Sequence, residues 1–538
     1  MRGWTDHLTV APVVVPMLAG AAMILLGEAR RRLVAALGLA SAGALVVLAV
    51  ALLVVAGGEV RVYRLGDWPA AFGIVLVADR LAAVMLGLVA VLGLAALVSS
   101  LARWHRAGVY FHPLFQFQLM GLNGAFLTGD LFNLFVFFEV MLAASYGLVL
   151  HGSGTARVRA GLHYLTINLV ASFLFLVGVS VVYGLAGTLN MADLAVRMRG
   201  IAAEDRALLE AGFAVLGVAF LVKAAMWPLG FWLPATYAAA GAAPAAILSV
   251  LSKVGIYALL RVWLLLFGGE AGPSAGFGAG WLTAGGLLTV GFGSVALLAT
   301  RDLARLAGAS VLVSSGTLLL ALGAGGGVMS GAAVTGGALF YLVGSALGIG
   351  ALFLLVELVE RGRAVGADVL AVTREALGEG DGEDERPDER DAVGVPVAGT
   401  VAILGTLFLA AALLLAGLPP MPGFLGKFAI LSPLLGTAGA PVPAASWLAV
   451  AALVLSGFAT AIAMLRVGIE AFWASPPEVP PRLGLAEVAP VAALLALGAA
   501  LTVGAGPAMG YLATAAERLH APADYLRAVR APRPGADG

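Results

Sequence analysis

Long apolar stretches recur along almost the whole of this 538-residue chain, and they constrain its fold more than any other feature. A helix that crosses a bilayer needs about 20 predominantly apolar residues. The sequence therefore predicts an all-α polytopic protein of the cell inner membrane. We expect about fourteen transmembrane helices on this length criterion, over residues 8–27, 33–57, 76–100, 109–128, 131–150, 162–186, 207–227, 243–268, 276–299, 306–323, 332–358, 396–436, 446–466 and 486–508.

The composition excludes several other classes of protein. Hydrophobic residues make up 61% of the chain and charged residues 12%, whereas a soluble domain carries about 25% charged residues. The formal net charge is zero, which gives no reason to expect a nucleic-acid partner. The chain has no cysteine, so disulfides, thiolate metal sites and a cysteine nucleophile are excluded. No motif for a metal or cofactor is present, and we expect neither on this chain.

Prolines interrupt the seventh and the twelfth of the predicted helices. Pro228 lies in KAAMWPLGFWLP (residues 223–234), and Pro419–Pro422 lie in GLPPMPGFLGKF (residues 417–428). Proline removes a backbone donor and clashes with the preceding turn, so each helix should be unwound there. Broken helices at corresponding places in two halves are typical of transport sites. We therefore expect two inverted five-helix repeats.

Arginines in the short loops predict the orientation of the chain. The positive-inside rule places the loops after the first, third, fifth and ninth helices in the cytoplasm and both termini outside. A polar, mixed-charge segment should then be a solvated cytoplasmic loop. The expected regions are 1–108 for the first three helices, 109–268 for the first repeat, 276–466 for the second repeat with the polar loop 361–393, and 486–538 for the last helix and a polar, loosely ordered tail.

All three lysines of the chain lie inside apolar stretches: Lys223, Lys253 and Lys427. A cation at the centre of a bilayer costs at least about 2.5 kcal/mol, so such a residue is a functional candidate. Lysine can release its proton when buried, whereas arginine stays protonated. We expect the three lysines to line a polar axis and to carry protons. The alternative is that each is a permanently charged partner in a buried ion pair or reaches the membrane surface.

Glu139 is the matching acidic residue. It lies in the middle of NLFVFFEVMLAASYG, flanked by aromatic residues. An isolated carboxylate in this place must be paired or neutral. We expect Glu139 and Lys223 to lie within direct or single-water reach and to form a gating ion pair. The alternative is a protonated carboxyl that only packs.

The other charged residues of the apolar regions are expected near helix ends. Asp130 should cap the helix that contains Glu139. Asp79, next to Arg80, should be interfacial. Arg261 follows Lys253 on the same predicted helix and is either a helix-end anchor or part of the path.

Three segments carry a family resemblance: FNLFVFFEVM, KAAMWPLGFWLPATYAAAGAAPAAILSVLSKVGIYALLR and GLPPMPGFLGKF. They resemble the antiporter-like subunits shared by Mrp cation/proton antiporters, respiratory complex I and membrane-bound hydrogenases, and the D subunit of Mrp is the most similar. The resemblance implies exchange of sodium or potassium for protons, with other Mrp subunits as partners and no cofactor. It assigns proton translocation to Glu139, Lys223, Lys253 and Lys427.

The chain departs from the family pattern between Lys253 and Lys427. Many relatives have a histidine at the position of Gly344, and some have a lysine at Gly348. Hydroxyl side chains can hold water in that region instead, namely Ser310, Ser314, Ser315, Thr317, Tyr341 and Ser345. Two other functions stay open: a proton-pumping subunit of a complex I-like or hydrogenase redox enzyme, and a membrane component for inorganic-carbon uptake.

Overall fold

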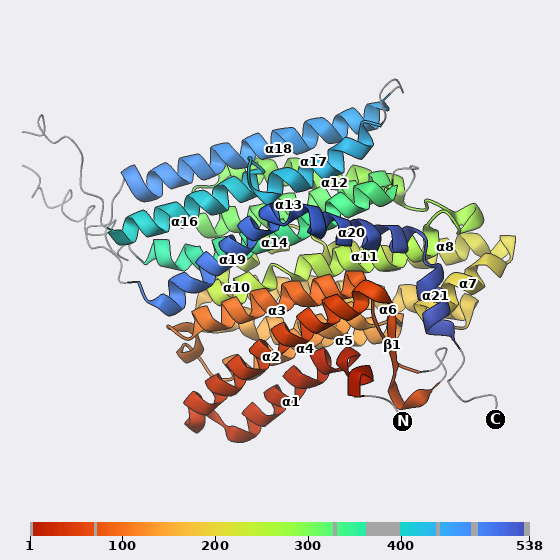
Figure 1. Ribbon diagram of the computed structural model, residues 1–538, viewed down its shortest axis with the longest axis horizontal. Helices are drawn as coiled ribbons and strands as arrows, with labels where there is room; N and C mark the ends of the chain where they lie inside the picture. Colours follow the sequence, from red (N-terminus) through yellow and green to blue (C-terminus); the bar gives the residue numbers. More distant parts are fainter. Residues whose placement is uncertain are drawn as a thin grey trace, which may run out of the picture.

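The computed structural model describes residues 4–68, 73–325, 331–361, 399–436, 442–474 and 483–531. Over these ranges the chain is a bundle of roughly aligned helices (Figure 1). Eleven of the described helices are long and apolar enough to cross a membrane. The prediction of an all-α, multi-pass membrane protein is confirmed. Apart from Arg361, the expected polar loop 361–393 lies outside the described residues.

The first half of the bundle contains the helices up to Phe267. Asp130 caps α5 by accepting a hydrogen bond of 2.9 Å from the Asn133 amide, as expected. Asp79 caps α3 in the same way, through the Ala82 amide at 3.0 Å. The helices are α1 (Ala11–Leu26), α2 (Arg31–Gly58), α3 (Arg80–Ser100), α4 (Phe111–Leu127), α5 (Leu131–Leu150), α6 (Thr155–Ala186), α8 (Ala203–Lys223), α9 (Trp232–Ala239), α10 (Ala242–Leu248) and α11 (Leu251–Phe267).

The second half wraps around two central helices. In the most apolar stretch of each helix, all residues of α13 and 94% of those of α14 are buried. In α2 only 33% of the corresponding residues are buried. The stretch formed by α10 and α11 is equally enclosed, at 94%. These helices form the axis of the bundle, and the outer helices expose apolar side chains that suit lipid. The remaining helices are α12 (Ala279–Ala299), α13 (Leu303–Gly325), α14 (Gly331–Glu360), α16 (Gly399–Ala416), α17 (Pro422–Leu434), α18 (Ala444–Ile469) and α19 (Leu485–Val503).

Small elements gather at the end of the bundle that the arginine distribution places outside. Strands β1 (Arg61–Arg64) and β2 (Val75–Ala78) pair antiparallel, with Arg61 opposite Ala78. Helix α7 (Met191–Arg197) lies beside them, and Figure 1 shows α7, β1 and α21 (Ala523–Arg530) together at one end. Neither the hairpin nor α7 is among the elements predicted from the sequence.

The prediction of a loosely ordered tail is wrong. The chain continues as α20 (Ala505–His520) and α21 (Ala523–Arg530). The two helices were not predicted because the segment as a whole is polar. Only one narrow face of α20 is apolar and buried. The buried stripe of α20 consists of Leu512, Ala515, Ala516 and Leu519.

Candidate functional site

The first proline interruption lies directly after Lys223. Helix α8 ends at this lysine, and regular helix resumes only at Trp232. Within the gap the Trp227–Pro228 peptide is cis, and Ala225 has a φ of 57°. The expected unwinding at Pro228 is confirmed.

The second interruption separates α16 from α17. Helix α16 ends at Ala416, the Pro419–Pro420 peptide is cis, and α17 begins at Pro422. Proline suits this first helical position because its missing N–H has no partner there in any case. The expected break is confirmed, while the inverted repeat itself stays a prediction.

A third interruption has no proline and was not expected. The stretch predicted over 243–268 forms one membrane span, Ala242–Phe267, but its regular helix is interrupted at Ser249 and Val250, which separate α10 from α11. Two hydroxyl groups bond to the carbonyl groups of the last turn of α10. Tyr237 donates to the Leu248 carbonyl at 2.6 Å, and Ser249 donates to the Ala246 carbonyl at 2.7 Å. Such local bonds compete with the helical pattern and stabilise its ending.

Each lysine lies beside one of these three breaks. Lys223 is the last residue of α8, Lys253 the third residue of α11, and Lys427 the sixth residue of α17. Their exposed fractions are 7%, 0% and 7%. A helix end exposes unpaired backbone dipoles, which interact with a nearby charge. The breaks therefore provide the polar surroundings that a lysine needs inside an apolar bundle.

Lys223 and Glu139 are connected through α6. The Lys223 ammonium donates to Oδ1 of Asn168 at 3.2 Å, and its Nζ lies 5.2 Å from the centre of the Phe138 ring. One turn further along α6, the Ser172 hydroxyl donates to the Glu139 carboxylate. Glu139 also acts on Lys223 through its charge, although no direct ion pair between them occurs among the described residues.

Lys253 is the most enclosed of the three lysines. Its ammonium makes a hydrogen bond of 3.4 Å to the hydroxyl of Ser252. Within the described ranges no carboxylate forms an ion pair with it. It lies at the N-terminal end of α11, where the helix dipole repels positive charge. Lys253 is thus a buried amine with few groups to hold its proton.

Lys427 reaches back across its own break. Its ammonium donates to the Ala416 carbonyl, the last of α16, at 3.3 Å. The carbonyl end of a helix attracts a cation. Gly417 and Gly457 leave room for the Lys427 side chain. A Cβ added at Gly417 would lie 3.1 Å from Cδ of Lys427, and a Cβ added at Gly457 would lie 3.4 Å from its Nζ.

Hydroxyl groups occupy the region between Lys253 and Lys427. Ser314 of α13 lies 3.0 Å from Ser345 of α14 (oxygen to oxygen). The Tyr341 hydroxyl lies near the hydroxyl groups of Ser314 and Thr317. The backbone of Tyr341 packs against Gly426, the residue before Lys427. The hydroxyl groups therefore form a polar cluster between α13 and α14, and α14 packs directly on α17 beside Lys427.

A cavity of about 410 Å³ opens at the end that the arginines place in the cytoplasm. Trp104 donates a hydrogen bond to Glu357 at its rim, and Arg361 joins Glu357 to Glu487 by ion pairs of 2.9 and 2.7 Å. The cavity reaches Tyr237, whose hydroxyl contacts the end of α10. It therefore provides access toward the break beside Lys253.

The participation of α6 was missed by sequence reasoning. Three polar residues follow one another at four-residue spacing on this apolar helix: Tyr164, Asn168 and Ser172. Residues spaced in this way lie on one helix face, so the stripe was a readable signal. Across the described residues no group of three or more histidine or acidic side chains is arranged to hold a metal ion.

Known proteins resemble this chain over nearly its whole length. Residues 128–375 match the family described as "NADH:quinone oxidoreductase/Mrp antiporter, TM". The chain is 54% identical to the D subunit of a probable K(+)/H(+) antiporter of Rhizobium meliloti (strain 1021), over 99% of this chain and 100% of the relative. It is 32% identical to the D subunit of a Na(+)/H(+) antiporter of Alkalihalophilus pseudofirmus, over 97% and 99%.

A solved structure gives the same result at the level of the fold. The Mrp complex from Dietzia sp. DQ12-45-1b contains a chain that superposes with a TM-score of 0.81 at 25% identity, over 98% of this chain and 100% of that one. Two relatives above 30% identity across nearly the full length, together with the family match, establish the relationship. The chain belongs to the NADH:quinone oxidoreductase/Mrp antiporter transmembrane family.

Proposed function

We propose that this chain is a proton-carrying subunit of a multisubunit antiporter that exchanges Na⁺ or K⁺ for protons, assembled with other Mrp-type subunits. One observation carries the proposal: Lys223, Lys253 and Lys427 are buried, and each lies beside a helix break. A chain that needed only fixed positive charge could use arginine, which fills almost every other basic position here. The D subunits named among the relatives support the same function.

The first step assigned to the site is a switch at Lys223. While Ser172 holds the Glu139 carboxylate, the negative charge and Asn168 favour the protonated ammonium. When the carboxylate moves away, desolvation favours loss of the proton from Nζ. The proton can then pass toward Lys253.

The later steps run along the centre of the bundle. Lys253 receives the proton near the break between α10 and α11. The hydroxyl cluster of Ser314, Tyr341 and Ser345, with water, passes it toward Lys427. Hydroxyl groups suit this role because each can donate and accept a hydrogen bond.

A second function is proton pumping in a redox complex. The family description itself includes NADH:quinone oxidoreductase, and the same lysines would serve there without cation exchange. The antiporter relatives, which match nearly the whole chain, favour the antiporter.

Transport in inverted membrane vesicles tests the proposal. The complete complex would be expressed in cells that lack their own antiporters, and a proton gradient would be imposed. We expect added Na⁺ or K⁺ to dissipate that gradient, and Lys253→Ala in an equally assembled complex to abolish the response. If neither cation has an effect, whereas an electron donor drives proton uptake, the redox function replaces the antiporter.

A further inference from the structure

Helix α11 carries a line of polar groups from Lys253 toward the end expected outside. Tyr257 and Arg261 follow Lys253 at four-residue steps and so lie on the same helix face. The eight residues from Lys253 to Arg261 correspond to roughly 12 Å along the axis. All three side chains are buried. Any connection between Lys253 and the outside along this face passes Tyr257 and then Arg261.

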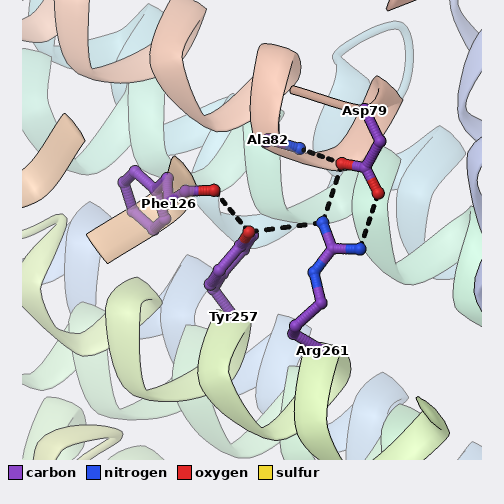
Figure 2. Close-up of polar contacts among 5 residues, drawn as sticks. All are labelled: Asp79, Ala82, Phe126, Tyr257 and Arg261. Carbon is purple, nitrogen blue, oxygen red and sulfur yellow. Dashed lines mark hydrogen bonds and ion pairs between the residues drawn. The ribbon is translucent and has the colours of Figure 1, made fainter. Parts of the chain in front are cut away.

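Arg261 is held in a closed arrangement with Asp79 (Figure 2). Its two terminal nitrogens lie 2.6 and 2.7 Å from the two carboxylate oxygens. It also donates to the Tyr257 hydroxyl at 3.3 Å, and that hydroxyl donates to the Phe126 carbonyl. One bidentate pair therefore ties α11 to the start of α3, and Tyr257 ties the same site to α4.

The C-terminal helix α21 covers this pair from the outside. The Tyr525 ring lies over the Arg261 guanidinium at 5.2 Å and is 6% exposed. Arg64 of β1 holds the end of α21 through the carbonyl groups of Val529 and Ala531, each at 2.9 Å. The hydroxyl of Tyr525 is buried without a hydrogen-bond partner among the described residues, so the ring is the part of this side chain that makes the cover.

A cavity the size of one water molecule lies at the covered pair. Its volume is about 20 Å³, and roughly 10–15 Å³ is enough to hold a water. Asp79 and Arg261 line it together with Arg518, Asp524 and Tyr525. The polar groups thus continue beyond the ion pair to side chains of α20 and α21.

The charges of the pair suit a barrier. Burial alone would raise the pKa of Asp79, but the charge and hydrogen bonds of Arg261 outweigh burial and hold that pKa below its ordinary value. The carboxylate therefore stays ionised at neutral pH, and arginine stays protonated at any accessible pH. Both members of the pair therefore stay charged and attract each other strongly in a region of low dielectric, which holds the face closed in front of Tyr257 and Lys253.

We propose that Asp79, Arg261 and the Tyr525 ring form the outer gate of the path to Lys253. The gate is closed in this structure, and it opens when α21 lifts and the ion pair parts, which connects the Lys253 face of α11 to the outside. This assignment rests on the proposed transport role of Lys253. A simple clamp between α3 and α11 is the competing role, but a buried ion pair is weak evidence for stability.

The absence of cysteine makes a direct access measurement possible. Ser252→Cys places a small thiol beside Lys253, because Ser252 is 0% exposed and its oxygen lies 3.4 Å from the lysine Nζ. The assembled complex in right-side-out vesicles would be treated with a membrane-impermeant methanethiosulfonate reagent. The measured quantity is the rate at which this subunit is modified.

We expect slow modification of Ser252→Cys alone and at least tenfold faster modification when Asp79→Asn or Tyr525→Ala is added. Tyr525→Phe is the matched control, since it keeps the covering ring and removes only the unpartnered hydroxyl; its rate should equal that of the parent. Equal rates for the parent and the assembled Asp79→Asn and Tyr525→Ala complexes would show that the pair is a clamp. If the Asp79→Asn complex does not assemble, the modification rate of the Tyr525→Ala complex distinguishes the gate from the clamp.

The labelling rate reports access and does not require transport. Failure of the proposed function would appear separately, as cation-driven proton movement that survives Lys253→Ala. The two results can therefore be told apart.

Discussion

Glu139 and Lys223 meet through α6, because Ser172 bonds to the carboxylate and Asn168, one helical turn away, accepts from the ammonium. The sequence predicted direct or single-water reach between the two charges. Among the described residues no direct ion pair joins them, and two polar side chains of a third helix contact one charge each; single-water reach stays a prediction. A small shift of α6 would change both contacts together, so this helix is placed to couple the acid to the base.

Ser172→Ala tests that coupling. We expect the complex to assemble and its transport rate to fall roughly tenfold, since a hydrogen bond to a charged group is worth about 1.5 kcal/mol and a tenfold rate change about 1.4 kcal/mol. Ser180→Ala is the control, because Ser180 lies on the same helix, is exposed and bonds only to the Leu176 carbonyl of its own helix. Equal rates for the two variants would remove α6 from the mechanism.

Lys223→Arg separates a proton carrier from a fixed charge. The arginine variant keeps the positive charge that Glu139 and Asn168 face, so it should assemble. It should nevertheless lose most of its transport, at least tenfold, since arginine does not release its proton at accessible pH. Lys223→Ala should lose transport too. The measurement is cation-driven proton movement at equal amounts of assembled complex, and near wild-type transport by Lys223→Arg would make Lys223 a structural charge.

Features that one local signal determines could be predicted from the sequence. Proline forbids a regular helix, so the breaks at Pro228 and at Pro419–Pro422 follow from composition alone. The burial of Lys223, Lys253 and Lys427 follows from their apolar neighbours. Each of these predictions needs only the residues within about two helical turns.

Features that depend on contacts between distant segments were out of reach. The break at Ser249 requires the hydroxyl of Tyr237, from another helix, to bond to the Leu248 carbonyl. The order of the C-terminal helices depends on packing against the bundle, as where Thr335 of α14 meets His520 of α20 at 3.0 Å. In each case the sequence near one residue gives no sign of the distant residue that it contacts. The ion pair of Asp79 and Arg261 is of the same kind, since 182 positions separate the two residues.

Gly426→Ala should destabilise the packing of α17 on α14. An added Cβ would lie 2.8 Å from the Cα of Tyr341 and 3.1 Å from its backbone nitrogen, and backbone atoms cannot rotate away. Overpacking of this kind costs about 1–3 kcal/mol. We expect a lower melting temperature of the detergent-solubilised complex. The control is Gly184→Ala in α6, where no atom lies within 4 Å of the added group; an equal effect of both substitutions would contradict the packing.

Tyr341→Phe tests whether protein hydroxyl groups connect Lys253 to Lys427. The substitution removes one oxygen and keeps the buried ring, so the packing of α14 should not change. Because the lost hydroxyl lies near Ser314 and Thr317 in the hydroxyl cluster, we expect transport to fall at least tenfold in an assembled complex. Ser345→Ala should have a similar effect, since it removes the 3.0 Å contact with Ser314.

Ser310→Ala is the matched control for these hydroxyl variants. Ser310 is buried one turn before Ser314 on α13, but its hydroxyl donates to the Leu306 carbonyl of the same helix. Its removal should leave transport unchanged. Full transport by Tyr341→Phe and Ser345→Ala would mean that water alone carries the proton across the centre. Loss in both, with Ser310→Ala unaffected, would show that the cluster takes the place of the titratable groups that this chain lacks at Gly344 and Gly348.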